Sequence, residues 1–279
     1  TNQAGSFTLA TNGNLVAGRR MRGETLLLTD VDAHVARFQG PPFVYGFTQV
    51  GSGCGVVSAG SCVVADQAAY WMGQNGFFVY DGRVQPLRSA VGDFIFENLN
   101  VSQRSKVVGV LNSQFSEVVW FYPSTGSTEN DSYVSYNYME GHWQVGTLSR
   151  TAGFDTGTFV YPNYVDATGI IYEHEVGYAY DSDTEVFAES GPIQLGNGDR
   201  MMVAKSLIPD EKTQGDVTAT FKTRFFPNGT ESSFGPFDMA NPTSVRFQGR
   251  QVQMRITGNT AASWRVGTMR LDVVEGGRR

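Results

Sequence analysis

Apolar and polar side chains alternate with a period of two along much of this chain. In residues 217–225 the odd positions would face one side of a strand and the even positions the other, because successive side chains of a β-strand point to opposite faces. The same alternation recurs in residues 251–256 and 268–274. One face of residues 217–225 carries Val217, Ala219, Phe221, Thr223 and Phe225, all of them apolar except Thr223. These stretches predict half-buried antiparallel strands.

Short strands separated by turn residues fill the first half of the chain. Residues 24–39 indicate two strands around a turn at 29–32, and residues 63–87 indicate three strands with Asn-Gly and Asp-Gly turns. Such dipeptides favour tight hairpins, because these turns need positive φ angles. Longer hairpins follow in residues 106–146, and the layout repeats about every fifty residues. Units of this length and texture are typical of propeller blades, with a β-sandwich as the competing interpretation.

The texture changes after about residue 167. The expected fold class is all-β, with β-propeller-like blades in residues 1–167 and a C-terminal antiparallel, β-sandwich-like domain in residues 168–279. An elaborated pair of blades is the alternative for the second part. The main helical candidate lies in residues 89–100, where Phe94, Ile95 and Leu99 could form one apolar face.

Composition agrees with this assignment and limits the partners. Glycine accounts for 33 of the 279 residues and charged residues for 17%, which suits turns more than exposed helices. The formal net charge is −6, so the chain lacks the broad positive field of duplex-binding proteins. No apolar run reaches the roughly 20 residues of a membrane span. The chain starts at Thr1 without a methionine, which suggests processing or a portion of a longer protein.

The two cysteines, Cys54 and Cys62, are close in sequence. We expect two reduced, buried thiols, because two cysteines in 279 residues are far fewer than a disulfide-stapled domain contains. A disulfide between them would instead favour an unrelated secreted propeller.

Two acidic segments were considered as metal sites. His174 lies between Glu173 and Glu175, but strand geometry would place both glutamates on one face and the histidine on the other. Asp181, Asp183 and Glu185 have the spacing of a calcium loop without its glycine and distant glutamate. Solvated polar segments are favoured in both places, and we expect no metal and no cofactor.

No catalytic residue is nominated by the sequence. A nucleophile elbow G-x-S-x-G is absent, and a carboxylate pair for glycoside hydrolysis could come from any of 27 acids. The large aromatics favour a core role over a sugar-stacking platform: Trp71, Trp120, Tyr122, Trp143 and Trp264.

Two groups of arginines are candidates for docking on neighbouring subunits. The first group is Arg19, Arg20 and Arg22, and the second is the terminal pair Arg278 and Arg279. Basic patches of this kind can dock on an acidic surface. The double change of Arg19 and Arg20 to glutamate is expected to block incorporation into particles and to leave the fold intact.

Several ordered blocks together resemble one family. They include "AAYWMGQNGFFVYDGRVQPL", "SEVVWFYPSTGSTENDSYVSYNYMEGHWQVGTLSRTA" and "GPIQLGNGDRMMVAKSLIPDE". These blocks are similar to tail structural proteins of tailed bacteriophages, most of all to the β-propeller tail nozzle or packaged-DNA stabilisation proteins. None of the blocks is catalytic.

The resemblance implies a non-enzymatic virion component, assembled in the host cytoplasm and located in the tail. It would form a ring-shaped homo-oligomer, for example a hexamer, that contacts the tail adaptor and other tail proteins. DNA would pass through its lumen without specific binding, and the ring would help to retain or release the genome. The alternative is a tail β-propeller that binds or cleaves host-surface glycan, which would need a pocket with paired carboxylates beside an exposed aromatic ring.

Overall fold

The computed structural model describes residues 5–178, 185–196, 200–258 and 262–277. The chain divides into two compact units, Thr1–Val176 (unit 1) and Gly177–Arg279 (unit 2). Both are built almost entirely of antiparallel strands, which confirms the all-β class. The division falls later than the expected boundary after residue 167, because the last short strand of unit 1 pairs with the strand before it.

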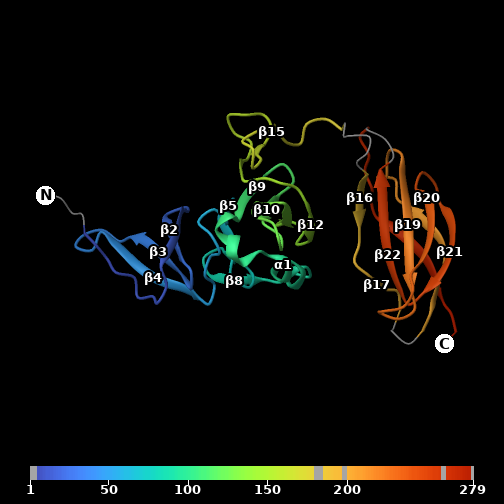
Figure 1. The fold of residues 1–279 in the computed structure, drawn as a ribbon, viewed down its shortest axis with the longest axis horizontal. Coiled ribbons are helices and arrows are strands. Elements are labelled where there is room, and N and C mark those ends of the chain that lie inside the picture. Colours follow the sequence, from blue (N-terminus) through green and yellow to red (C-terminus); the bar gives the residue numbers. More distant parts are fainter. Residues whose placement is uncertain (1–4, 179–184, 197–199, 259–261, 278–279) are drawn as a thin grey trace. The chain divides into compact units, whose positions relative to one another are not determined.

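Unit 1 contains three four-stranded sheets, each a meander of consecutive strands, and one three-stranded sheet (Figure 1). The first sheet comprises β1 (Leu15–Arg20), β2 (Glu24–Thr29), β3 (Asp32–Phe38) and β4 (Tyr45–Ser52). The second comprises β5 (Cys62–Ala65), β6 (Ala68–Met72), β7 (Phe77–Tyr80) and β8 (Val84–Leu87). The third comprises β9 (Val108–Asn112), β10 (Glu117–Tyr122), β11 (Ser132–Asn137) and β12 (Trp143–Thr147). The fourth comprises β13 (Ala152–Phe154), β14 (Asn163–Val165) and β15 (Ile171–Glu173).

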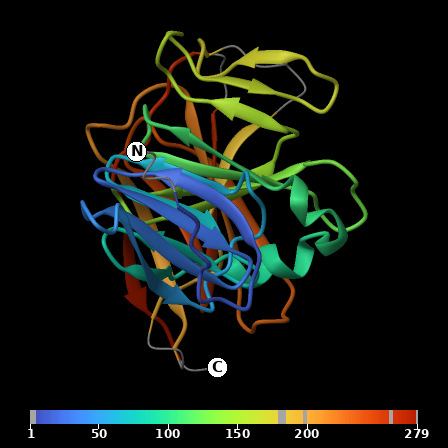
Figure 2. The ribbon, with the colours of Figure 1, turned by 90° about the vertical axis from the view of Figure 1, so that its left-hand side faces the viewer.

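Consecutive sheets of unit 1 pack face to face and share cores. Leu26 and Leu28 of the first sheet pack with Trp71 of the second, and Phe77 of the second packs with Trp120 of the third. The third and fourth sheets meet at a smaller core around Tyr164; the fourth sheet is visible as three short arrows in Figure 2. The strand count and order of each meander fit a blade, and a radial arrangement around a channel stays a prediction.

Strand β10 of the third sheet contributes side chains to two cores of unit 1. Five of its six residues are buried, because its two faces lie in two different cores: Trp120 and Tyr122 in one, Phe121 in the other. A strand that is buried on both faces reads as a continuous apolar run. The buried Trp71, Trp120 and Tyr122 are core residues, as expected, whereas Trp143 and Trp264 are only partly buried.

The helix lies within the predicted residues, but one residue of its predicted apolar face is exposed. Helix α1 spans Gly92–Asn98 and is followed by a 3₁₀ helix at Val101–Lys106. Ile95 and Leu99 are buried, one turn apart, but Phe94 is 57% exposed. Phe96 packs on Phe77 instead, with ring centroids 5.4 Å apart, because it lies on the side of the helix that faces the sheet.

Cys54 and Cys62 are free, buried thiols, which confirms the expectation. Burial raises the pKa of Cys54 to about 11 and that of Cys62 to about 12. Both therefore stay protonated and unreactive at neutral pH.

The arginines predicted to dock on neighbours differ in their surroundings. Arg19 donates hydrogen bonds to the carbonyl oxygens of Cys62 (2.9 Å) and Ala59 (2.6 Å), so its guanidinium ties the first sheet to the second. These hydrogen bonds give Arg19 a structural role, so an Arg19→Glu change is expected to lower the stability of unit 1 as well. Arg20 and Arg22 are exposed, and their interface role stays a prediction. Arg278 and Arg279 lie outside the described residues.

Unit 2 consists of two sheets that enclose one core (Figure 1). One sheet has the order β16-β22-β19-β20, with β17 also paired to β22, and the other has the order β21-β18-β23. The strands are β16 (Val186–Glu189), β17 (Ile193–Gln194), β18 (Met202–Pro209), β19 (Val217–Arg224), β20 (Ser232–Asp238), β21 (Thr243–Gly249), β22 (Gln251–Gly258) and β23 (Met269–Glu275). The alternation predicted over residues 217–225 is confirmed as far as Thr223, while Phe225 lies past the strand end and is 36% exposed.

No helix among the described residues is long and apolar enough to cross a membrane. In the acidic segment with calcium-loop spacing, Asp181 and Asp183 lie outside the described residues. Glu185 instead forms an ion pair with Arg255.

Candidate functional site

A pocket lies between the third and fourth sheets of unit 1 and is lined in part by polar and ionisable side chains. We call it the inter-sheet pocket. Its volume is about 240 Å³, slightly below the range of about 300–1,000 Å³ of typical small-molecule sites. Its lining combines apolar and polar side chains, all from unit 1: Asn112, Glu117, Val119, Phe121, Tyr133, Ser135, Gln144, Leu148, Tyr164, His174 and Glu175.

Local strand pairing brings the first polar groups together. Asn112 ends β9 and stands directly opposite Glu117, the first residue of β10. Gln144 on β12 donates a hydrogen bond from Nε2 to Glu117 Oε1 at 3.3 Å. Three strands of one sheet therefore present an amide, a carboxyl and a second amide to the same end of the pocket.

Glu175 approaches the same place from the segment after β15. Asn112 Nδ2 donates to Glu175 Oε1 at 3.0 Å, which holds Glu175 beside the strand position opposite Glu117. Glu175 has φ of +62°, a left-handed conformation that is uncommon for residues other than glycine. Unusual backbone conformations of this kind concentrate at functional sites.

The sequence-based prediction that His174 faces away from the glutamates is wrong. Strand β15 ends at Glu173, and the left-handed Glu175 breaks the alternation, so His174 and Glu175 both line the pocket. Within the described chain, no group of three or more histidine, cysteine, aspartate or glutamate side chains could hold a metal ion.

The charge of Glu175 affects the ionisation of Glu117. Burial raises the pKa of Glu117, and the negative charge of Glu175 raises it further, while His142 acts in the opposite direction. Glu117 therefore retains its proton to a higher pH than an ordinary glutamate does. Glu175 is exposed and its charge is one cause of this shift.

His174 is held in its neutral form. Arg150 donates from Nε to His174 Nε2 at 2.9 Å, and burial together with the Arg150 charge lowers the pKa of His174 to about 4. Because Nε2 accepts this hydrogen bond, the ring proton is on Nδ1. The imidazole ring also packs on the Tyr164 ring, with centroids 4.1 Å apart.

Two buried polar atoms at the pocket have no partner in the described structure. They are Asn112 Oδ1 and the Tyr164 hydroxyl, whose residues are both 4% exposed. Burial raises the pKa of Tyr164, so its hydroxyl is a neutral donor. An unpaired buried polar group costs about 1–3 kcal/mol, which a bound molecule with its own donors and acceptors would recover.

The glycan-binding alternative also calls for an exposed aromatic ring beside the two carboxyl groups. Phe121 and Tyr164 are almost fully buried and form the floor, so the pocket offers no exposed stacking platform. Sequence reasoning missed this site because the 27 acids carry no signal that separates Glu117 and Glu175 from the rest. An acidic residue at the start of the strongly apolar stretch 117–122 was the one available hint.

Comparisons with known proteins identify no family for this chain. No family model matches the chain, and no curated protein matches it. Among solved structures, an exo-β-1,3-galactanase from Phanerochaete chrysosporium with galactose has 11% identity and a TM-score of 0.30, covering 90% of this chain and 78% of that one. A glycoside hydrolase has 10% identity and a TM-score of 0.31, covering 86% of this chain and 80% of that one.

Both neighbours are glycoside hydrolases, and they contradict the expectation that the chain is not an enzyme. That expectation is withdrawn. TM-scores near 0.3 are too low to carry an activity from these structures to this chain. The resemblance to phage tail proteins stays a prediction.

Proposed function

We propose that this protein binds a glycan in the inter-sheet pocket and cleaves a glycosidic bond there. The observation that carries the proposal is the pairing of Glu117, whose pKa is raised, with Glu175, whose charge helps to raise it. Glycoside hydrolysis needs two carboxyl groups, one protonated and one ionised, on either side of the scissile bond. Environments that separate the two pKa values assign these roles.

In this proposal Glu117 donates its proton to the leaving oxygen, and Glu175 acts as base or nucleophile on the opposite side. Asn112 Oδ1 and the Tyr164 hydroxyl, which have no protein partners, accept from and donate to sugar hydroxyls. The neutral His174 offers its Nδ1 proton as a further donor. The pocket volume of about 240 Å³ suits one sugar ring.

The test is hydrolysis of a panel of oligosaccharides by the wild-type protein and by Glu117→Gln. Removal of a general acid costs about 10²–10⁴-fold in rate, so Glu117→Gln should lose at least a hundredfold in kcat and keep its affinity for the substrate. Glu97→Gln is the matched control, because Glu97 is an exposed glutamate on α1. Equal rates for Glu117→Gln and the wild type would overturn the proposal.

We also propose that the chain is a component of a phage tail, the setting that the sequence resemblance implies, in which the glycan would belong to the host surface. A specific observation supports assembly with further copies. Phe38, Phe43 and Tyr45, at the β3–β4 hairpin, are 67%, 74% and 55% exposed. Aromatic residues are enriched at protein interfaces, and a second copy would bury these three.

The oligomeric state tests this part. Light scattering of the wild-type protein should give the mass of a closed multimer, and the double variant Phe43→Ser with Tyr45→Ser should shift the mass towards the monomer. Phe159→Ser is the control, because Phe159 is exposed at a different place. A wild-type protein that stays monomeric at all accessible concentrations would exclude the ring.

A further inference from the structure

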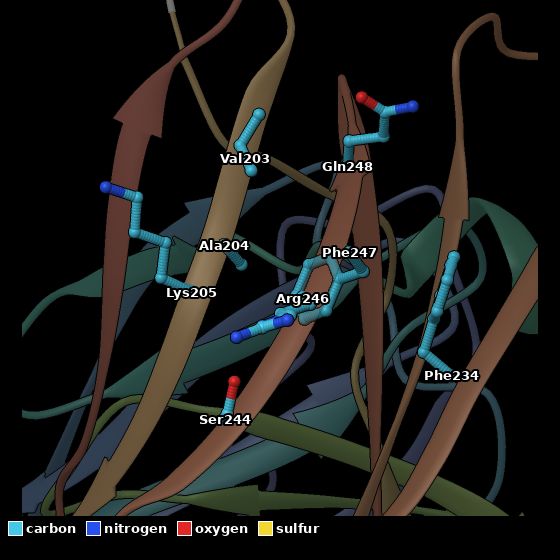
Figure 3. A pocket seen from close by; sticks show the side chains of 8 residues that line it. All are labelled: Val203, Ala204, Lys205, Phe234, Ser244, Arg246, Phe247 and Gln248. Atoms are coloured by element: carbon cyan, nitrogen blue, oxygen red, sulfur yellow. The ribbon is translucent and has the colours of Figure 1, made fainter.

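Unit 2 carries a hollow of about 610 Å³ on the sheet of order β21-β18-β23 (Figure 3). We call it the cationic hollow and define it by Lys205 on β18 and Ser244, Arg246 and Gln248 on β21. It is independent of the inter-sheet pocket, since every residue that lines it belongs to unit 2.

The backbone is irregular at both cations. Ala204 pairs with Phe247 and Ser206 with Ser244, so the register of β18 against β21 shifts across Lys205. The pairing of β18 with β23 shifts at the same point. Arg246 has φ of +38°, in the left-handed region. Bulges re-aim side chains and are frequent beside functional sites, and the two irregularities coincide here.

These four side chains share the outer face of the sheet. Ser244, Arg246 and Gln248 are exposed and alternate with the buried Val245 and Phe247, as the period of a strand requires. Lys205 is exposed as well. Figure 3 shows the Arg246 guanidinium over the space between β18 and β21, with Ser244 beside it.

Neither cation has an ion-pair partner among the residues that the structure describes. Within the described residues Lys205 and Arg246 form no ion pair, whereas Lys222, Arg224 and Arg255 of the same unit all do. Asp272 stands opposite Ser206 on β23 and forms no ion pair with either cation. The outer face therefore presents two positive charges on either side of β18: Arg246 lies over the hollow beside Ser244, and Figure 3 shows Lys205 directed towards β23.

This donor set fits an anion that also carries hydroxyl groups. An arginine guanidinium matches the two oxygens of a carboxylate or sulfate, and lysine adds a second charge. Ser244 and Gln248 can bond to neighbouring hydroxyls. The apolar part of the lining consists of Val203, Ala204, Phe234 and Phe247, and the apolar face of a sugar ring can pack against it.

We propose that the cationic hollow binds an acidic sugar residue of a glycan. The inference rests on the proposed function only in taking the ligand to be a saccharide, and it deepens that function by naming an acidic substrate. Unit 2 would then hold a charged polymer while unit 1 cleaves it.

The experiment is calorimetric binding by the full chain carrying Glu117→Gln, so that the probe is not consumed. The probes are a short oligogalacturonide, a sulfated galacto-oligosaccharide and a neutral galacto-oligosaccharide of equal length. Lys205→Gln with Arg246→Gln should weaken binding of an anionic probe at least tenfold and leave the neutral probe unaffected. The two anionic probes distinguish carboxylate from sulfate as the preferred group. Lys212→Gln with Arg270→Gln is the control, because it removes the same charge elsewhere in unit 2.

Equal losses in both double variants would mean that net charge acts rather than the hollow, and would overturn the proposal. Absence of binding to both anionic probes would overturn it as well. Failure of the proposed hydrolysis is a separate outcome: Glu117→Gln would then hydrolyse as fast as the wild type while the hollow variants still lost binding.

Discussion

Glu117 illustrates how one residue acquires a role from its surroundings. It begins a strand whose other residues are buried, so its carboxyl group is carried out of water with them. A glutamate in such a place is expensive to ionise, and the charge of Glu175 adds to the cost. The hydrogen bond from Gln144 and the influence of His142 offset only part of this cost, and a carboxyl group with a raised pKa in a pocket is typical of function.

The cost predicts a pH-dependent gain in stability for Glu117→Gln. Because the folded-state pKa is raised above the ordinary value of 4.5, the native state holds more protons than the unfolded state just above that pH, and its stability falls as pH rises through this window. Glutamine never ionises. The variant should therefore be more stable than the wild type at pH 7.5 and show a higher Tm.

Thermal melts at several pH values check this. The difference between Glu117→Gln and the wild type should vanish below about pH 4.5, the ordinary value for glutamate, where both side chains are neutral. Glu97→Gln should show no such trend. A variant that is less stable than the wild type at pH 7.5 would indicate that the carboxylate is stabilised in the fold.

Among the elements, the loop after β15 and strand β1 each provide side chains that contact a neighbouring sheet. The first places His174 and Glu175 against the third sheet, and the second joins two sheets through Arg19. In both cases a side chain spans the boundary between consecutive meanders. Other side chains also cross such boundaries, for example the Tyr80 hydroxyl of the second sheet, which donates to Glu24 Oε1 of the first at 2.6 Å.

Arg19→Ala should therefore destabilise unit 1. Hydrogen bonds from a charged group contribute about 1.5–3 kcal/mol each when both partners are satisfied, and this change leaves the carbonyl oxygens of Ala59 and Cys62 without their donor. We expect a loss of about 2 kcal/mol, measured by denaturant unfolding. Arg20→Ala, at the exposed neighbour, should stay within about 0.5 kcal/mol of the wild type, and equal losses in the two variants would contradict the assignment.

At the scale of the whole molecule, the two units differ in how they expose binding chemistry. Unit 1 stacks meanders so that a pocket forms at the seam between its third and fourth sheets. Unit 2 closes two sheets around one core and places its cations on an outer face. An acidic glycan would use both features, and a multimer would repeat both around its axis.

Much of the fold could be predicted from the chain itself. Alternation in residues 217–223 follows from side-chain period and hydrophobicity alone, and the free cysteines follow from their small number in the chain. The exposed Phe94 and the inward-facing His174 were predicted wrongly. The first depended on which side of a short helix meets a sheet, and the second on a left-handed residue at Glu175.

The all-β class and the positions of most strands could be predicted from the sequence, because they follow from local side-chain period and composition. That Asn112, Glu117, Tyr164 and Glu175 meet is a consequence of the tertiary fold. Their meeting depends on the packing of one sheet on the next and on a single backbone conformation after β15. A pKa shift, an unpaired hydroxyl and a pocket arise from distances between residues remote in the chain, and no local pattern encodes those distances.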